Sequence, residues 1–222
     1  MKRRWVRVPG GNLEAGDSLA QQLNIDLSLA RILVQRGILS FDDARHFFRP
    51  QMSKLHDPYL MKDMDRAISR IDKALEKNEK ILIYGDYDVD GTTAVALTYG
   101  FFNKFTDRID YYIPDRHKEG YGISTQGIDY AHLQGFNLII ALDCGIKSTD
   151  KVAYANSLGI DFIICDHHLP GELLPDAAAI LDPKRSDCSY PFKELSGCGI
   201  GFKLAQAYCV KHNLPIRSMS NL

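Results

Sequence analysis

The sequence predicts an α/β fold: a five-stranded, mostly parallel sheet with helices on both faces, preceded by a small helical region. Five short, continuous apolar runs lie in the second part of the chain, and patterns typical of helices separate them. Continuous apolar strands that alternate with helices indicate a parallel sheet that is covered on both faces. The chain has 222 residues, of which 45% are hydrophobic and 25% charged, so it is long enough to bury such a sheet without disulfide bonds.

Residues 1–57 predict short helices, which we expect to form an N-terminal helical region. Apolar residues recur there near helical spacing until Gly37 ends the pattern; they are Leu19, Leu23, Leu27, Ala30, Leu33 and Val34. Ser40 and Asp43 have the spacing of a capping box and predict a helix over 42–48, which Pro50 closes.

Residues 58–222 predict the sheet domain. It is expected to begin with an amphipathic helix over 58–78, whose apolar face consists of Met61, Met64, Ile68, Ile71 and Leu75. The apolar runs that predict strands are 81–84, 109–113, 138–142, 162–165 and 177–181. Helices are predicted over 91–105, 124–134, 148–157 and 199–212.

Composition and charge exclude several classes of protein. The longest apolar runs are far shorter than the roughly 18 residues that a membrane-spanning helix needs. The basic N-terminus is followed by Pro9-Gly10-Gly11, which predicts no signal peptide, so we expect a cytoplasmic protein without membrane attachment. The net charge of -1 excludes a generally basic surface, although residues 1–54 carry nine Lys/Arg against five Asp/Glu. Five cysteines without a Cys-x-x-Cys pair predict reduced thiols, with zinc as the minor alternative.

Acidic and histidine residues follow three of the predicted strands. The first strand leads into Asp86, Asp88 and Asp90, the third into Asp143, and the fourth into the triplet Asp166-His167-His168. In an open α/β sheet, ligands bind at the carboxyl ends of the strands. Carboxylates that crowd together repel one another unless cations neutralise them, and Asp oxygens with His nitrogens suit Mn²⁺, or Mg²⁺. The sequence therefore predicts a two-metal site.

Each of these segments has a simpler interpretation. The run Asp86-x-Asp88-x-Asp90 resembles the start of an EF-hand, but Leu97 stands where a calcium loop needs Glu. It could also be a solvated acidic turn, His167-His168 a surface pair, and Asp143 a helix cap. The joint placement at three strand ends favours the metal site. The glycines at 197, 199 and 201 predict a tight turn that opens the last helix, with an approach to a phosphate as the alternative.

The loop after the second predicted strand offers groups for a nucleic-acid substrate. Arg116 can bind a phosphate with its guanidinium fork, and the ring of Tyr121 can stack on a base. An ordinary connecting loop with a surface arginine is the alternative.

Segments along the chain resemble, in order, the motifs of the DHH phosphoesterase superfamily, and within it those of the RecJ family of single-strand-specific DNA exonucleases. The superfamily motifs match Gly85 to Gly91, Asp143 and the Asp166-His167-His168 triplet. The RecJ family is similar at Pro114-Asp115-Arg116, Glu119-Gly120-Tyr121-Gly122, Leu181-Asp182-Pro183-Lys184 and Phe202-Lys203.

The resemblance implies a role for each candidate residue. The metal pair is expected on Asp88, Asp90, Asp143 and His167, with Asp86 as a further ligand. His168 is expected near the scissile phosphate, Asp166 as its support, and Arg116 and Tyr121 at the nucleic-acid phosphate. The catalytic set is then Asp88, Asp90, Asp143, His167 and His168.

The resemblance also implies the function: a Mn²⁺- or Mg²⁺-dependent phosphodiesterase domain of a 5′-to-3′ single-stranded DNA exonuclease in DNA repair and recombination. Single-stranded DNA is the expected substrate, a single-strand-binding protein and a helicase are the expected partners, and the chain is expected to be a monomer. RecJ proteins are longer, and their fourth metal motif has no counterpart before Leu222. We therefore expect a chain that ends before this ligand and is a weak nuclease by itself.

Two other functions remain open at this stage. One is a phosphohydrolase of the same superfamily that acts on a small molecule or short oligonucleotide, such as a cyclic dinucleotide or pyrophosphate. Such enzymes typically open the first motif with His-x-Asn-Pro-Asp, where this chain has Tyr84-Gly85-Asp86-Tyr87-Asp88. The other is a non-catalytic scaffold, whose ligand residues would be expected to have decayed, whereas here they are intact through the third motif.

Overall fold

The computed structural model describes residues 4, 6 and 12–215, which form two compact units that divide between Leu55 and His56. The first unit consists of the helices α1 (Leu13–Leu23), α2 (Leu27–Gln35) and α3 (Phe41–Phe48), followed by the short 3-10 helix η1 (Met52–Lys54). Its core consists of Leu19, Ala30, Leu33, Val34, Ile38 and Ala44.

Local capping determines where the helices of the first unit begin and end. Asn24 adopts a left-handed conformation and ends α1, and Asp26 caps α2 by accepting from the Ser28 amide. The predicted apolar pattern is therefore divided between two helices. The predicted capping box is confirmed, because Ser40 and Asp43 each accept a hydrogen bond from the other's backbone amide.

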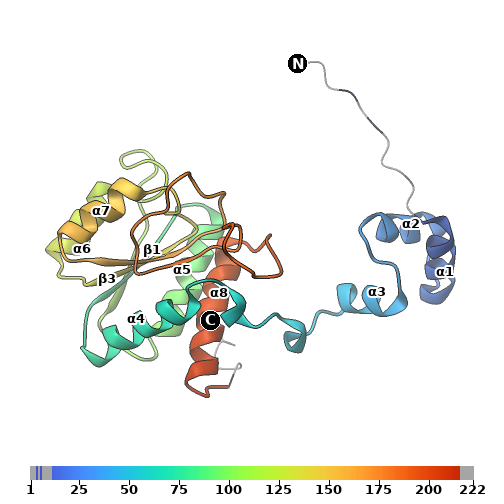
Figure 1. The fold of residues 1–222 in the computed structure, drawn as a ribbon, viewed down its shortest axis with the longest axis horizontal. Coiled ribbons are helices and arrows are strands. Elements are labelled where there is room, and N and C mark those ends of the chain that lie inside the picture. The colour runs from blue at the N-terminus through green and yellow to red at the C-terminus, as the bar shows by residue number, and fades with distance from the viewer. Residues whose placement is uncertain (1–3, 5, 7–11, 216–222) are drawn as a thin grey trace. The chain divides into compact units, whose positions relative to one another are not determined.

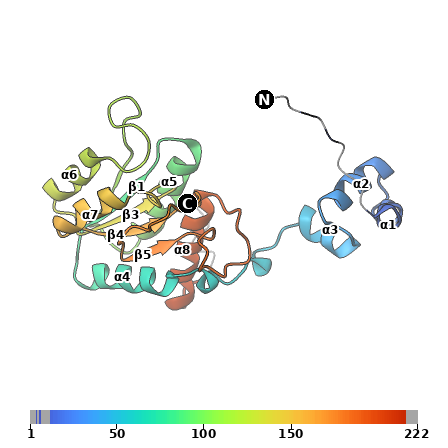
Figure 2. The ribbon, with the colours of Figure 1, turned by 45° about the horizontal axis from the view of Figure 1, so that its top comes forward.

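The second unit is built on a parallel sheet with the strand order β2-β1-β3-β4-β5 (Figures 1 and 2). The strands are β1 (Ile81–Gly85), β2 (Ile109–Tyr112), β3 (Leu138–Leu142), β4 (Asp161–Cys165) and β5 (Ala179–Leu181), and all four pairings are parallel. The predicted strands are confirmed in place, and the sheet is parallel throughout. Every residue of β1, β3 and β5 is buried, which explains their continuous apolar sequences.

Helices cover both faces of the sheet, as Figure 2 shows. One face carries α4 (Met64–Glu76), α5 (Val89–Phe102) and α8 (Gly197–Lys211), and the other carries α6 (Thr125–Leu133) and α7 (Thr149–Ser157). Side chains alternate accordingly along β1: Ile81 and Ile83 belong to the core under α4, α5 and α8, whereas Leu82 and Tyr84 belong to the opposite core.

The structure differs from the sequence prediction over residues 58–78. A 3-10 helix, η2 (Pro58–Leu60), precedes α4, and Asp63 separates the two with a left-handed backbone (φ 65°). The side chain of Asp63 is buried and accepts a hydrogen bond from the Arg185 guanidinium at 2.7 Å. A contact with a residue more than a hundred positions away thus accompanies the break in the predicted helix.

The described residues contain no helix that is long and apolar enough to cross a membrane. The five cysteines carry no disulfide bond, and Cys144, Cys165, Cys188 and Cys209 are buried.

The Asp63 carboxylate allows a test of how the loop after β5 is held. Replacing Arg185 by Met should lower the free energy of unfolding by about 3 kcal/mol, because Asp63 is then left buried without its main partner. Replacing Arg66 by Met should cost less than about 1 kcal/mol, since Arg66 reaches the same carboxylate at 3.4 Å but is 58% exposed. Urea unfolding measures both values, and equal losses for the two variants would contradict the prediction.

Candidate functional site

Four aspartates stand in one row at the carboxyl edge of the sheet. The strand registers pair Gly85 with Leu142, Leu142 with Cys165, and Cys165 with Leu181. The residue that directly follows each of these four strands is an aspartate, and all four aspartates are buried: Asp86, Asp143, Asp166 and Asp182. The strand order reverses between β1 and β3: β2 lies on the outer side of β1, and β4 and β5 lie on the outer side of β3. The row crosses this switch point, and open α/β sheets bind ligands at such points.

Asp143 is a buried member of the row that contacts a histidine. Its side chain is 3% exposed, and its Oδ1 lies 3.0 Å from Nε2 of His167. Burial, followed by the charges of Asp90 and Asp88, raises the pKa of the Asp143 carboxyl to about 7. Its backbone is left-handed (φ 60°), which turns the chain directly after β3. The carboxyl is thus held in a place that favours its neutral form or a nearby cation.

Asp90 joins the first acidic motif to the last helix. Its two oxygens accept hydrogen bonds from the amides of Gly197, at 2.7 Å, and Cys198, at 2.8 Å. These amides belong to the first turn of α8, whose dipole favours a negative charge there. Asp90 Oδ2 also lies 3.7 Å from His167 Nε2. The histidine nitrogen therefore faces oxygens from two different strand ends.

Glycine is required where α8 approaches the row. A Cβ atom on Gly197 would lie 2.5 Å from the Cβ of Asp143, far inside van der Waals contact. A Cβ on Gly91 would lie 2.4 Å from the backbone oxygen of Asp86. Gly197 was predicted to form part of the turn that opens the last helix. In the structure its lack of a side chain also allows α8 to pack against Asp143.

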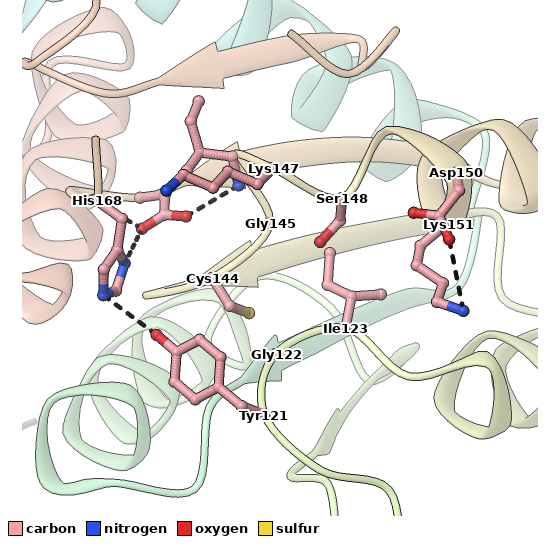
Figure 3. Close-up of a pocket in the computed structure, with 12 residues that line it drawn as sticks. Tyr121, Gly122, Ile123, Cys144, Gly145, Lys147, Ser148, Asp150, Lys151 and His168 are labelled. Carbon is pink, nitrogen blue, oxygen red and sulfur yellow. Dashed lines mark hydrogen bonds and ion pairs between the residues drawn. The ribbon is translucent and has the colours of Figure 1, made fainter. Parts of the chain in front are cut away.

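Asp166 fixes the orientation of the His-His pair. Its carboxylate accepts from the backbone amides of Ile146, His167 and His168, and from Nδ1 of His168 at 2.7 Å. Because Nδ1 donates to this carboxylate, Nε2 of His168 faces the Tyr121 hydroxyl at 3.1 Å (Figure 3). Burial, followed by the charges of Asp86 and Asp143, raises the pKa of Tyr121, so the hydroxyl keeps its proton and can donate it to Nε2.

Asp86 and Asp88 occupy different environments. Asp86 is fully buried, its oxygens make no hydrogen bond of good geometry with the described residues, and burial raises the pKa of its carboxyl. Asp88 is exposed and caps α5 by accepting from the Gly91 amide at 2.9 Å. Its charge nevertheless acts on both Asp86 and Asp143.

Donor atoms of Asp143, His167 and His168 lie within 4.8 Å of one another and could hold a metal ion. Asp90 adjoins this group through His167, whereas Asp88 acts on Asp143, and Asp86 interacts with His168, through charge alone. The buried Asp86 oxygens without partners and the raised pKa of Asp143 are what a site for a divalent cation would show before the cation binds. The residues therefore fit Mn²⁺ or Mg²⁺.

The loop after β2 presents Arg116 and Tyr121. The Arg116 guanidinium lies 5.3 Å from the centre of the Tyr87 ring, and Arg116 forms no ion pair with the described residues. The Tyr87 ring contacts that of Tyr121 edge to face, and Tyr121 contacts His168 in the same way. Arg116 is thus connected to the His-His pair through two aromatic rings.

Buried hydrogen bonds hold this loop in place. The Tyr84 hydroxyl donates to the carbonyl oxygen of Gly122 and accepts from the Ser124 amide, both at 3.0 Å. Glu119 accepts from the hydroxyls of Tyr112 and Ser124. The position of Tyr121 is therefore determined by residues of β1, β2 and the start of α6.

Two members of this site are not among the predicted site residues. Asp182 follows its strand as the other three aspartates do, and burial raises the pKa of its carboxyl to about 6; the fifth apolar run could have indicated it. Tyr87 lies between two aspartates, and no periodicity pointed to its contact with Arg116.

Comparison with curated proteins finds single-stranded-DNA-specific exonucleases. The chain is 44% identical to RecJ of Bacillus subtilis over 206 residues, which is 93% of this chain and 26% of that protein. It is 36% identical to RecJ of Escherichia coli over 180 residues, which is 81% of this chain and 30% of that protein. The chain thus spans about a quarter to a third of the length of these relatives.

Comparison with solved structures finds the same family. A crystal structure of exonuclease RecJ bound to manganese matches with a TM-score of 0.64 and 28% identity, over 70% of this chain and 39% of that one. RecJ from Thermus thermophilus in complex with Mn²⁺ matches with a TM-score of 0.71 over 92% of this chain and 28% of that one; at 22% identity it shows the fold alone.

The family match agrees with the motifs and with the fold. The DHH family, N-terminal domain, matches residues 80–221, which include the four-aspartate row, the His-His pair and α8. The predicted resemblance to this superfamily, and to RecJ within it, is confirmed. The chain belongs to the DHH family and contains its N-terminal domain.

Proposed function

We propose that this chain is the metal-binding part of a phosphodiesterase that hydrolyses single-stranded DNA. The observation that carries the proposal is the convergence of the buried Asp143 carboxyl with His167 and Asp90 at the edge of a parallel sheet. The RecJ relatives, which are named for their specificity for single-stranded DNA, support the choice of substrate.

Asp143, His167, Asp88 and Asp90 would hold Mn²⁺ or Mg²⁺, with Asp86 as a further ligand. Two RecJ structures are described as Mn²⁺ complexes and one as a Mg²⁺ complex, which supports this choice of ions. Two such ions, when bound, would activate a water molecule and stabilise the leaving oxygen of a phosphodiester. The deprotonated Asp143 carboxylate and the neutral His167 imidazole are the forms that bind a cation.

The remaining residues orient the histidine pair and the substrate. Asp166 holds His168 by accepting from Nδ1, which fixes the imidazole beside Asp143 and His167, where a phosphate would lie. Tyr121 donates to Nε2 of the same ring and keeps its orientation. Arg116, which faces no carboxylate among the described residues, would bind a phosphate of the DNA strand.

The wider function is part of the same proposal. We infer a 5′-to-3′ exonuclease of DNA repair and recombination that works as a cytoplasmic monomer with a single-strand-binding protein and a helicase. The test is release of nucleotides from 5′-phosphorylated single-stranded DNA with Mn²⁺. We expect slow release by this chain and none by an Asp143→Ala variant. Equal rates for the two proteins, or hydrolysis of cyclic dinucleotides or pyrophosphate alone, would contradict the proposal.

Mn²⁺ binding should depend on the protonation of Asp143. Since the pKa of this carboxyl is raised to about 7, a proton competes with the cation below that pH and no longer competes above it. Calorimetric titration should therefore show affinity that rises from about pH 6 to about pH 8 and then levels off. Asp143→Ala should remove most of the binding, and Asp107→Asn, at the opposite edge of the sheet, should not change it. Unchanged stoichiometry and affinity in Asp143→Ala would refute the assignment.

Gly197 offers a second test of the same carboxyl. A Cβ at this position must displace Asp143 or α8, so Gly197→Ala should weaken Mn²⁺ binding and lower the free energy of unfolding by about 1 to 3 kcal/mol. Gly199→Ala is the matched control in the same turn, because its Cβ would meet the Leu195 side chain at 3.3 Å and the Ser196 hydroxyl at 3.6 Å, and not Asp143. Urea unfolding and Mn²⁺ titration measure both effects. If the two variants behave alike, the contact with Asp143 is not the cause.

Arg116 should contribute to DNA binding without regard to base sequence. Arg116→Ala should weaken the binding of single-stranded DNA by about 1 to 3 kcal/mol, because one charged contact to a phosphate is lost. Arg108→Ala removes an exposed arginine before β2, at the other edge of the sheet, and should have no such effect. Fluorescence anisotropy with oligonucleotides of different sequence measures the change. A loss restricted to particular sequences would count against a phosphate contact.

A further inference from the structure

A hollow of about 330 Å³ lies beside His168, between the loops that follow β2 and β3. We call it the α7 hollow; its walls include Tyr121, Ile123, Ile146, Lys147, Ser148 and Lys151. The site described above occupies only one end of it, where Asp166, His168 and Tyr121 contribute to the lining. The rest of the hollow has no role in the proposed function so far.

The floor of the α7 hollow is apolar. Ile123, Cys144 and Ile146 line it and are 6%, 2% and 2% exposed, so they form a rigid surface that belongs to the core under α6 and α7. Figure 3 shows Ile123 and Cys144 between Tyr121 on one side and Ser148 on the other. An apolar floor with a few polar groups around it is typical of a small-ligand site, and a flat ring fits such a floor.

The rim of the hollow on the side of α7 carries two lysines and one aspartate, Asp150. Lys147 is exposed and forms no ion pair with the described residues, and its stem runs close to Gly171. Lys151 lies one helical turn further on, where it donates to Thr125 Oγ1 at 2.9 Å and lies 3.7 Å from Asp150, which is 76% exposed. Ser148 caps α7 by position but makes no capping hydrogen bond, so its hydroxyl is available to a ligand.

Arg116 does not line this hollow; it packs on Tyr87 instead. The candidate site therefore has cationic groups at two separate places, with Tyr121 and His168 between Arg116 and the lysines. A DNA strand carries a phosphate on each side of every nucleoside. A nucleoside over the apolar floor would thus place one phosphate at His168 and the other towards Lys147 and Lys151.

We propose that the α7 hollow binds the nucleoside on the 3′ side of the reacting phosphate, so that its 5′ phosphate lies at His168 and Lys147 and Lys151 hold its 3′ phosphate. The inference rests on the proposed function, because it takes His168 as the place of the reacting phosphate. It names the minimal ligand as a nucleoside with a phosphate on both the 3′ and the 5′ oxygen, rather than a lone phosphate or a small phosphodiester.

The test uses the 222-residue chain with Mg²⁺ and deoxyadenosine 3′,5′-bisphosphate as the probe. We expect changes in the amide NMR signals of Gly122, Lys147 and Ser148, and binding about tenfold tighter than that of the 5′-monophosphate. Inorganic phosphate should leave the signals of the hollow unchanged. Signals that change only around Arg116 and Tyr87 would overturn the proposal.

Two variants and one control complete the experiment. Lys147→Ala should reduce affinity for the bisphosphate about tenfold and leave affinity for the monophosphate unchanged. Ser148→Leu should fill the hollow and weaken both, with the fold checked by circular dichroism. Lys77→Ala, which removes an exposed lysine after α4, should change neither.

The outcomes separate this inference from the proposed function. If the chain releases nucleotides from DNA with Mn²⁺ while Lys147→Ala binds the bisphosphate as the parent chain does, the inference is wrong and the function stands. If the bisphosphate binds in the hollow and loses affinity in Lys147→Ala, but no DNA is hydrolysed, the hollow is a nucleotide site and the proposed function is wrong.

Discussion

The repulsion among carboxylates at the end of β1 and β3 is the constraint on which the rest of this site depends. Asp86 and Asp143 are withdrawn from water, the charge of Asp88 acts on both of them, and the charge of Asp90 acts on Asp143. Each such carboxyl either takes up a proton or requires a cation nearby. The raised pKa of Asp143 shows that the described residues alone do not supply enough positive charge. The repulsion among these carboxylates therefore destabilises the fold, and a bound cation would relieve it.

The structure relieves part of this repulsion through α8. The amides of its first turn bind both oxygens of Asp90, so the helix brings positive charge to the row without adding a cationic side chain. This solution requires close packing, because Gly197 meets Asp143 and Gly91 meets the backbone of Asp86. The last helix of the domain is thereby fixed to the first acidic motif. The site therefore depends on where α8 packs, because the amides of its first turn must reach Asp90.

Much of the fold could be predicted because its signals are local. Buried parallel strands are continuous apolar runs, so the run 138–142 coincides with β3 (Leu138–Leu142), and the acidic residues after each run could be assigned to one edge. The interruption before α4 could not be predicted, because it involves Asp63 and the distant Arg185. The contact of Tyr87 with Arg116 and the hollow beside α7 depend on how separate loops come together, which no periodicity records.

The sparse positive charge around this site limits how a DNA strand can be recognised. Among the described residues near the row, Lys184 pairs with Glu194, and Arg185 pairs with Asp63 and Asp187. Arg116 lies on one side of the His-His pair and Lys147 with Lys151 on the other, and the chain as a whole has a net charge of -1. Such a distribution gives little long-range attraction for a polyanion. Recognition must then come from short-range contacts: the exposed ring of Tyr121, the half-buried ring of Tyr87 beside it, and an apolar floor that a base can cover. Unpaired bases expose their faces for such contacts and paired bases do not, so this geometry suits the single-stranded DNA of the proposed function better than a duplex.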